Sequence, residues 1–355
     1  MNWRDNVRKT EPYVPGEQPK VSGTIIKLNT NENPYPPSPA VRAVLDNINI
    51  SDYRLYPDTD AAPLTAALAD YYGVKPENVF VGVGSDDVLA MSFLTFFNSE
   101  KDILFPDITY SFYKVWAELY NIPYSCPKLD DNFKISPEDY IPGRYLKENG
   151  GIVIANPNAP TSVAMPVSDI EKIIAANSGS VVIVDEAYID FGGESVLPLV
   201  SKYDNLLVVR TFSKSRSMAG VRIGFAIGNE ELISALKAIK NSYNSYTMNM
   251  SSILLGTASI EDDEYFKDIL NKIIHTRELF VGKLVELGFD VLPSSANFVF
   301  AKHKSVSAKF IFKELKKKNI FVRYFDKPRI DDRLRITVGT EEEMAALVKA
   351  LEKLL

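Results

Sequence analysis

Four groups of polar residues directly follow apolar runs of the sequence, and they contain the side chains best suited to react with carbonyls and bind anions. The groups are Gly84-Ser85-Asp86, Asn156 to Ser162, Asp185 to Tyr188 and Ser213-Lys214. If the apolar runs are strands of an open α/β sheet, ligands bind beyond the carboxyl ends of those strands. We therefore expect the four groups to line one crevice.

Lys214 has the most reactive side chain of this set. It lies in the string TFSKSRSMAGVRIG, just after an apolar run, with several hydroxyl side chains beside it and Arg222 eight positions further on. A single lysine is most often a solvated surface residue. A lysine that is partly shielded from water can instead form a Schiff base with a carbonyl compound, and the position of Lys214 favours this chemistry.

Asp185 and the glycine turn at Gly82–Asp86 could serve the same ligand. Backbone N–H groups at a helix start can hold a phosphate, although Ser85 or Asp86 could be a simple N-cap. Asp185 could be an exposed strand-end aspartate or a magnesium ligand of a nucleotide hydrolase. The latter is disfavoured because the string G-x-x-x-x-G-K-[ST] is missing. A lysine, an aspartate for a pyridinium nitrogen and a phosphate cradle together are what pyridoxal phosphate requires.

The composition argues against several other classes of function. The 355 residues are 46% hydrophobic and 24% charged with a formal net charge of −6, which suits a globular protein better than a nucleic-acid binder. Cys126 is the only cysteine and His275 and His303 are the only histidines, so we expect no metal site. No apolar run is long enough to span a membrane, and the first residues do not resemble a signal peptide. We expect a cytoplasmic protein with no nucleic-acid or membrane partner.

The elements that must position these residues are short apolar segments alternating with longer amphipathic ones. Continuous apolarity predicts strands buried on both faces, as in a mainly parallel sheet, at 79–84, 102–105, 151–157, 180–188, 205–213 and 222–228. Periodicity predicts helices at 86–97 and 109–120 and a long helix at about 262–287, ended by Gly288. Strands in NFVFA, IFVR and LRITVG and helices around 309–318 and 341–354 follow.

These patterns predict an α/β fold: a large domain with a mainly parallel sheet flanked by helices, plus a smaller α+β domain. We expect an N-terminal arm over 1–51 that joins the small domain, the large ligand-binding domain over 52–258 and the small C-terminal domain over 259–355. The arm is expected because the first residues are rich in Pro, Asn and Gly, with NENPYPPSP as the densest turn cluster.

Over nearly its whole length the chain resembles the class II aminotransferases of pyridoxal-phosphate fold type I, and among them the histidinol-phosphate aminotransferases. The strings that carry the resemblance are KLNTNENPYPPSP, RLYPD, VGVGSDD, DITYSFY, NPNAPTS, VDEAYIDF, TFSKSRSMAGVR, SSANFVF and LRITVG. TFSKSRSMAGVR is highly specific, and the others occur in the family's order and spacing. The resemblance implies pyridoxal 5'-phosphate as the cofactor and supports the two-domain fold.

The resemblance also implies roles around the cofactor ring. Lys214 would bind the cofactor aldehyde and later move a proton between substrate and cofactor. Asp185 would pair with the pyridine nitrogen, Tyr188 would donate to the phenolic oxygen, and Tyr110 would stack on the ring. The residues that would hold the cofactor phosphate are Ser85, Asp86, Ser213 and Arg222, together with Tyr56 of a second copy.

On the same basis, Tyr56 implies a homodimer with shared active sites. Arg335 would bind the carboxylate of glutamate or the phosphate of histidinol phosphate, because bidentate oxyanion recognition suits arginine. Arg323 and Tyr13 would be secondary contacts to the substrate phosphate. The ordinary alternatives are a strand-surface residue for either arginine and an arm anchor for Tyr13. Tyr110 could be a core aromatic residue.

The sequence departs from the family pattern in two places. The family asparagine that contacts the cofactor's phenolic oxygen corresponds to Ala159, so either Asn158 makes this contact or Tyr188 makes it alone. Arg216 and Ser217 stand where an aromatic and a variable residue are common, and this would place an extra cation near the cofactor.

The resemblance implies transamination between a phosphorylated amine, L-histidinol phosphate, and a 2-oxo acid, 2-oxoglutarate, in histidine biosynthesis. Two alternatives share the framework: a lyase similar to threonine-phosphate decarboxylase, and an aminotransferase for aromatic or other amino acids. They differ in which Cα bond lies perpendicular to the cofactor ring, and the sequence does not fix this torsion. A binding protein without chemistry is disfavoured because Lys214, Asp185 and Arg222 are all present.

Overall fold

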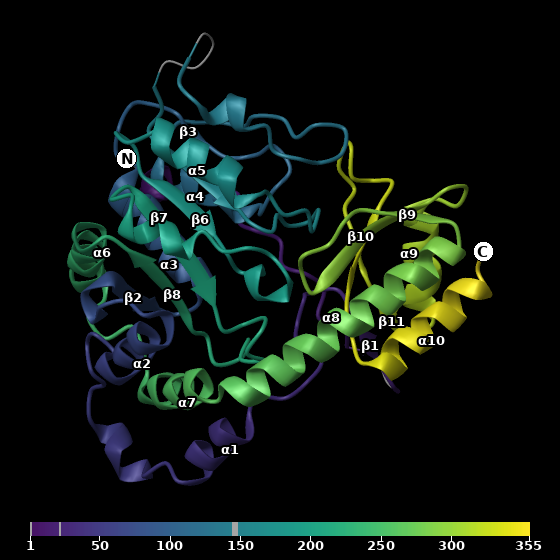
Figure 1. The fold of residues 1–355 in the computed structure, drawn as a ribbon, viewed down its shortest axis with the longest axis horizontal. Coiled ribbons are helices and arrows are strands. Elements are labelled where there is room, and N and C mark those ends of the chain that lie inside the picture. Colours follow the sequence, from purple (N-terminus) through teal and green to yellow (C-terminus); the bar gives the residue numbers. More distant parts are fainter. Residues whose placement is uncertain (1, 21–22, 144–147) are drawn as a thin grey trace.

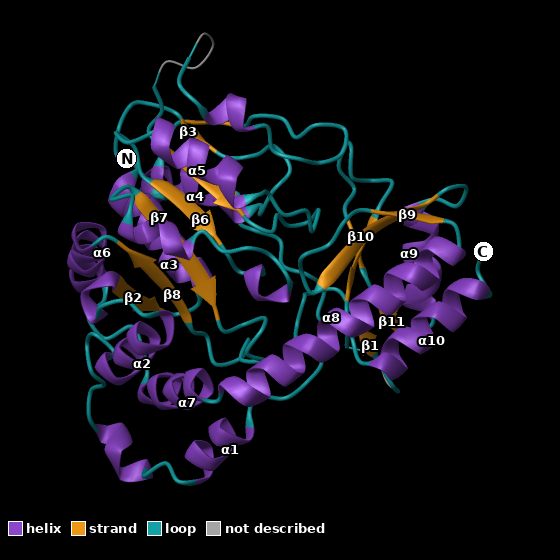
Figure 2. Ribbon diagram, viewed as in Figure 1, coloured by secondary structure: helices purple, strands orange, loops and turns teal. Residues whose placement is uncertain are grey.

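The computed structural model describes residues 2–20, 23–143 and 148–355, which form two packed parts joined by the long helix α8 (Asp263–Glu286) (Figure 1). Figure 2 shows a large sheet with helices on either side in one part and a small sheet with helices beside it in the other. The predicted α/β fold with a smaller α+β part is confirmed.

The large sheet has seven strands in the order β2-β8-β7-β6-β5-β3-β4. All neighbouring pairs are parallel except those that involve β8, which runs antiparallel to both β2 and β7. The strands are β2 (Val79–Gly82), β3 (Ile103–Leu104), β4 (Tyr124–Ser125), β5 (Gly151–Ala155), β6 (Val182–Asp185), β7 (Leu206–Thr211) and β8 (Gly224–Gly228).

The strands are continuously apolar because both faces of the sheet are covered. On β5, Ile152 and Ile154 pack into the core on one face and Val153 and Ala155 into the core on the other. Burying both faces removes far more apolar area from water than a half-exposed sheet could, and this is the main source of its stability. The helices on the first face are α2 (Ala62–Tyr72), α5 (Val167–Ala176) and α7 (Met250–Glu261); those on the second are α3 (Ser85–Phe96), α4 (Phe112–Tyr120) and α6 (Glu230–Tyr243).

The smaller part contains two sheets. A four-stranded antiparallel sheet has the order β12-β13-β10-β9, and a two-stranded parallel sheet joins β1 of the N-terminal segment to β11. The strands are β1 (Ile26–Lys27), β9 (Phe289–Val291), β10 (Phe298–His303), β11 (Ile320–Phe321), β12 (Arg323–Tyr324) and β13 (Leu334–Thr337), and the helices are α9 (Ala308–Lys317) and α10 (Glu341–Glu352). Short 3-10 turns complete the structure at Trp3–Asn6, Ile50–Arg54 (η2), Pro76–Asn78, Pro137–Tyr140, Ile189–Phe191 and Leu197–Ser201.

The N-terminal segment contacts both parts of the molecule. Through β1 it extends a sheet of the smaller part, whereas α1 (Pro39–Asp46) packs against α7 of the larger part. Helix α8 also contacts both, because Ile269 and Ile273 pack beside Phe191 while Leu284 lies in the core of the smaller part. The division at 52 and 259 stays a prediction.

Several local expectations need correction. The segment IFVR is not one strand, since β11 and β12 belong to different sheets. The helix expected from 109 begins at Phe112. None of the helices in the described residues is long and apolar enough to cross a membrane.

Candidate active site

A cavity of about 450 Å³ lies where the strand ends of the large sheet face the N-terminal segment and the smaller part. Because β2, β5, β6 and β7 run in the same direction, their carboxyl ends meet at one edge of the sheet. The structure places almost all of the expected site residues around this cavity: Tyr13, Ser85, Asp86, Tyr110, Asp185, Tyr188, Ser213, Lys214, Arg222, Arg323 and Arg335.

One end of the cavity brings together groups that could hold a phosphate. Helix α3 begins there after Gly84 without a side-chain cap, so the N–H groups of its first turn are directed toward the cavity edge. The Arg222 guanidinium lies beside them, with NH1 3.4 Å from the Ser213 hydroxyl and NH2 3.6 Å from the Asp86 carboxylate. Uncapped N–H groups beside a cation and a hydroxyl form an oxyanion site.

Gly84 is required at this turn for two reasons. Its φ of +87° lies in the left-handed region that glycine favours, and a Cβ added to it would lie 2.4 Å from NH2 of Arg222. Strand β8 passes equally close, since a Cβ on Gly224 would lie 2.2 Å from the backbone of Gly84. The two glycines let the phosphate cradle and Arg222 approach each other.

Asp185 ends β6 at the floor of the cavity and is 5% exposed. The Tyr113 hydroxyl donates to Oδ2 at 2.7 Å and the Ala187 N–H donates to Oδ1 at 3.1 Å, but among the described residues no cation pairs with the carboxylate. Burial therefore raises the pKa of Asp185 to about 6. A protonated ring nitrogen at this position would supply the missing positive charge.

Lys214 follows β7 and reaches across to the N-terminal segment. Its Nζ donates to the Thr30 carbonyl at 3.1 Å and lies 5.9 Å from the centre of the Tyr188 ring. Two side-chain hydrogen bonds hold the loop around Lys214. The Asn33 side chain donates to the Lys214 carbonyl at 3.0 Å, and the Ser215 hydroxyl donates to Asp190 at 2.6 Å. The amine is thus held at the cavity while its backbone cannot shift freely.

Tyr188 and Tyr110 form aromatic walls of the cavity. The Tyr110 hydroxyl donates to Asp86 at 2.7 Å, and burial together with that carboxylate raises the pKa of Tyr110. The Tyr188 ring packs edge-on against Phe298, and its hydroxyl accepts a hydrogen bond from the Asn31 side chain at 2.9 Å. The Tyr110 phenol therefore stays protonated, and both side chains are held by hydrogen bonds.

The other end of the cavity is a second anion site, formed by the smaller part. Arg335 of β13 donates to the Asn29 carbonyl at 2.9 Å, while its Nε is buried with no partner among the described residues. Burial and the neighbouring Arg323 lower the pKa of Arg335, as expected for a cation that awaits an anion. Tyr13 lines the same region and stacks on Phe112 at 4.1 Å.

Asn158 does not line the cavity. Its side-chain amide donates to the Ile108 carbonyl at 2.9 Å and to the Thr161 hydroxyl at 3.1 Å, and its oxygen accepts from Thr109 at 2.7 Å. With these contacts made, the amide holds two loops together and has no proton left for a cofactor. Ala159 lies against Tyr188, Ala296 and Phe298 in a small apolar cluster.

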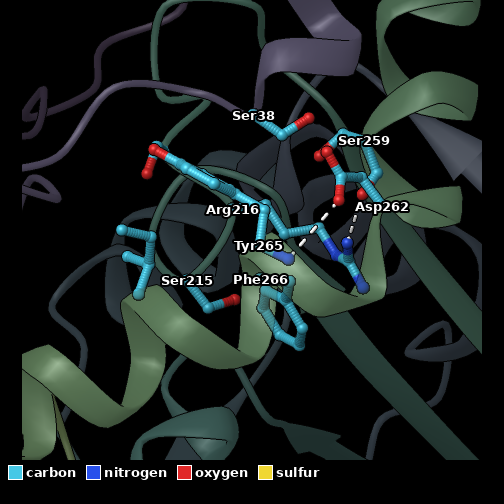
Figure 3. A pocket seen from close by; sticks show the side chains of 9 residues that line it. Ser38, Ser215, Arg216, Ser259, Asp262, Tyr265 and Phe266 are labelled. Carbon is cyan, nitrogen blue, oxygen red and sulfur yellow. Dashed lines mark hydrogen bonds between the residues drawn. The ribbon is translucent and has the colours of Figure 1, made fainter.

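Arg216 does not add a cation to the cavity, contrary to the expectation from the sequence. Its guanidinium lies instead at a separate pocket of about 10 Å³, lined in part by residues of α7 and α8. Figure 3 shows it beside Ser259 and Phe266. There it donates to the Ser259 carbonyl and lies 3.9 Å from the centre of the Phe266 ring. Ser217 takes a left-handed φ of 61°, which turns this stretch away from Lys214.

Tyr56 also lies outside the cavity of its own chain. It is 80% exposed and stacks on Tyr246 at 4.5 Å. Within its own chain Tyr56 therefore makes no contact with the cavity.

Sequence reasoning missed the contribution of the N-terminal segment. Thr30, Asn31 and Glu32 line the cavity, and each makes a hydrogen bond to another residue of the site or its rim. Their string, KLNTNENPYPPSP, contains the turn cluster and carries part of the family resemblance, but no site role is predicted for these three residues, although the dense side-chain amides are a signal for such contacts. Within the described residues no cluster of His, Cys, Asp and Glu could hold a metal ion.

Solved structures share this fold. The histidinol-phosphate aminotransferase of Clostridium acetobutylicum superposes with a TM-score of 0.85 at 23% identity, covering 93% of this chain and 99% of that one. The histidinol-phosphate aminotransferase of Sinorhizobium meliloti in complex with pyridoxal-5'-phosphate gives a TM-score of 0.84 at 22% identity, covering 93% and 92%. Together with a lysine, a buried aspartate and a phosphate cradle in one cavity, this fold defines an enzyme of pyridoxal-phosphate fold type I.

Comparison of the amino-acid sequence with known families and relatives identifies the family of this chain. The model of the family "Aminotransferase class I and II" matches residues 23–351. The histidinol-phosphate aminotransferases of Lactococcus lactis subsp. lactis (strain IL1403) and Clostridium beijerinckii are each 52% identical, over 99% of this chain and 96% and 97% of theirs. The chain belongs to the class I and II aminotransferase family.

Because the Asp185 carboxylate is buried, we expect the cofactor-free protein to become more stable when the charge of this side chain is removed. An unfolded aspartate has a pKa near 3.9, so the folded protein without cofactor loses stability as pH rises from about 4 to 6 and remains less stable above that window. Asp185→Asn should therefore stabilise the cofactor-free protein at pH 7.5 by about 1 to 3 kcal/mol. The measurement is urea unfolding at fixed protein concentration.

The gain should be smaller at pH 5 than at pH 7.5. Asp70→Asn, on the exposed side of α2, is the matched control and should change the free energy of unfolding little at either pH. A cofactor-free Asp185→Asn protein that unfolds at lower urea than the wild type at pH 7.5 would contradict the assignment.

Proposed function

We propose that this chain transfers the amino group of L-histidinol phosphate to 2-oxoglutarate, with pyridoxal phosphate as the cofactor, as a step of histidine biosynthesis. The observation that carries the proposal is a single cavity with two separate anion sites, one at α3 and Arg222 and one at Arg335 and Arg323, with Lys214 lining the same cavity. The 52% identical relatives named for this activity support the choice of substrate.

The residues at the α3 end fit the cofactor. When bound, pyridoxal phosphate supplies an aldehyde carbon and a ring that withdraws electrons from the substrate. The first turn of α3, Ser213 and Arg222 would hold its phosphate, and Asp185 would hold the protonated ring nitrogen. With the carboxylate buried, that nitrogen keeps its proton, because removing it would leave the charge of Asp185 unpaired.

Lys214 is the only amine among the residues that line the cavity, so it is the group that binds the aldehyde and moves a proton to and from the substrate carbon. The Thr30 carbonyl, which accepts from Nζ at 3.1 Å, gives the amine a fixed resting direction. Tyr110 and Tyr188 line the same cavity, and with a ligand bound their rings would shield the amine from water.

The Arg335 end fits both substrates in turn. L-Histidinol phosphate carries a phosphate and 2-oxoglutarate a distal carboxylate, and each would pair with Arg335 and Arg323. The aromatic side chains of Tyr13, Tyr110 and Phe325 line the space between and suit a flat ring such as imidazole. This shared anion site would allow one cavity to accept an amine and an oxo acid of different shape.

The arrangement also favours a homodimer that shares its sites. Exposed apolar side chains lie on α1, on η2 and the loop after it, on α6 and the loop after it, and on α7; besides Tyr56 they are Leu45, Ile50, Tyr53, Leu55, Tyr243, Tyr246 and Leu254. These segments contact one another, because Tyr56 stacks on Tyr246, Tyr53 bonds to Ser251 of α7, and α1 packs on α7. Exposed apolar side chains on segments that contact one another are typical of a protein interface. In the dimer, Tyr56 would reach the cofactor phosphate of the other copy.

The arm over 1–51, the domains over 52–258 and 259–355 and the cytoplasmic location stay predictions.

The function is tested by mixing the cofactor-loaded enzyme with L-histidinol phosphate in the absence of an oxo acid. The visible absorption of the cofactor should fall, and 2-oxoglutarate should restore it with formation of glutamate. Lys214→Ala should abolish both steps, whereas Lys202→Ala, at an exposed ion pair with Glu171, should not. Release of carbon dioxide from threonine phosphate without amino transfer would assign the lyase activity instead.

Arg335→Lys should raise the KM for both substrates by about tenfold or more, because lysine cannot make the bidentate contact to an oxyanion. Steady-state kinetics with each substrate varied in turn measures the change. Arg42→Lys, at an exposed pair with Asp46, is the matched control. An unchanged KM for both substrates would mean that the anion binds elsewhere.

Shared sites predict complementation between two defective variants. Lys214→Ala lacks the amine and Tyr56→Ala lacks the contact to the other copy, so each should have little activity alone. A mixed dimer would contain one site with both residues intact, and activity should rise after the two proteins exchange subunits. No rise, with exchange verified by mass spectrometry, would show that Tyr56 does not act across an interface.

A further inference from the structure

The Tyr188 hydroxyl has a hydrogen-bond partner that the sequence did not suggest, Asn31 of the N-terminal segment. The Asn31 side-chain nitrogen lies 2.9 Å from the Tyr188 oxygen. Asn31 is 1% exposed and has a φ of 56°, a left-handed conformation that asparagine tolerates better than most residues. The smaller part holds it in place, because the Asn297 side chain donates to its carbonyl at 3.0 Å.

The orientation of the Asn31 amide follows from Thr337. The Thr337 hydroxyl oxygen accepts the backbone N–H of Asn31 at 3.0 Å, and its own proton is then free to be donated to Asn31 Oδ1, 3.1 Å away. A hydroxyl has one proton, and with Oδ1 toward Thr337 that proton has an acceptor, whereas a turned amide would take this acceptor away. In the structure the amide nitrogen accordingly faces Tyr188 and donates to it.

This donation determines where the proton of Tyr188 points. The phenol oxygen accepts from Asn31, so its O–H cannot be directed at Asn31 and is available for an acceptor elsewhere. Tyr188 lines the cavity, and no other hydrogen bond of its hydroxyl is found in the described part of the chain. The proton is left for a ligand in the cavity.

We propose that Asn31 is a positioning residue: it directs the Tyr188 proton onto the phenolic oxygen of the cofactor, and so strengthens one contact to that oxygen in a chain where the direct contact of an amide at the place of Ala159 is missing. Ala159 has no amide and lies in an apolar cluster, and the Asn158 amide is committed to two loops. The inference rests on the proposed function, since it requires pyridoxal phosphate in the cavity.

The test uses the full-length protein loaded with pyridoxal phosphate and two readouts other than turnover. One is the dissociation constant of the cofactor, and the other is the pH at which the cofactor bound to Lys214 changes its visible absorption. That linkage shares a proton with the phenolic oxygen, and a hydrogen bond donated to the oxygen stabilises its negative, deprotonated form. Loss of a directed donor should raise the midpoint of the colour change.

Asn31→Gly removes the amide at a position where glycine takes the left-handed φ without strain. It should raise the midpoint by about 1 pH unit and weaken cofactor binding several-fold. Asn31→Asp retains the size and the backbone preference but can only accept, so it would attract the Tyr188 proton away from the cofactor. Its midpoint should rise at least as far.

The Tyr188→Phe background separates a positioning role from a structural one. If Asn31 acts through the phenol, Asn31→Gly should cause no further shift when Tyr188 is phenylalanine. An equal shift in both backgrounds, or midpoints and dissociation constants of the Asn31 variants equal to those of the wild type, would overturn the inference. A wild-type protein that takes up no cofactor would instead overturn the proposed function.

Discussion

Three consecutive residues of the N-terminal segment hold the two sides of the cavity together. The Asn29 carbonyl accepts from Arg335, the Thr30 carbonyl accepts from Lys214, and the Asn31 amide donates to Tyr188. Two of the three contacts use backbone carbonyls, which are obligatory acceptors and cannot be left unpaired inside a protein. These contacts fix the Lys214 amine and the Tyr188 ring of the larger part relative to Arg335 of the smaller part. The sheets, α8 and the strand pair of β1 and β11 serve to keep this segment where it is.

The large sheet sets the other side of the cavity at a cost in stability. Strand β6 places Asp185 in a buried position where the carboxylate is poorly solvated and pairs with no cation among the described residues. Gly84 and Gly224 lie where two backbone segments approach too closely for a side chain. Such features lower the stability of the empty protein, and they are tolerated because both faces of the sheet are buried. Binding of a cationic ring and its phosphate would recover that stability. The site is in this sense incomplete as a polypeptide alone.

The sequence predicts the framework well because burial of a sheet on both faces leaves a strong pattern, as in the runs ending at Ala155 and Asp185. It does not reveal the reversed direction of β8, since an apolar run carries no sign of its orientation. The residues after the strands were found because strand direction brings them to one edge. Asn31, Asn158 and Arg216 were missed or misplaced for a common reason: their roles depend on which way a side chain turns, and this is decided by partners far along the chain, such as Thr337, Ile108 and Ser259.

Tyr56, exposed and stacked on Tyr246, would link the concentration of the protein to its chemistry if the proposed dimer forms. If Tyr56 completes the phosphate site of another copy, cofactor binding and association share one free energy, and each must tighten the other by the same factor. Dilution would then release cofactor as well as subunits, and cofactor depletion would favour single chains. A cell that makes little of this protein would lose activity more steeply than in proportion to its amount.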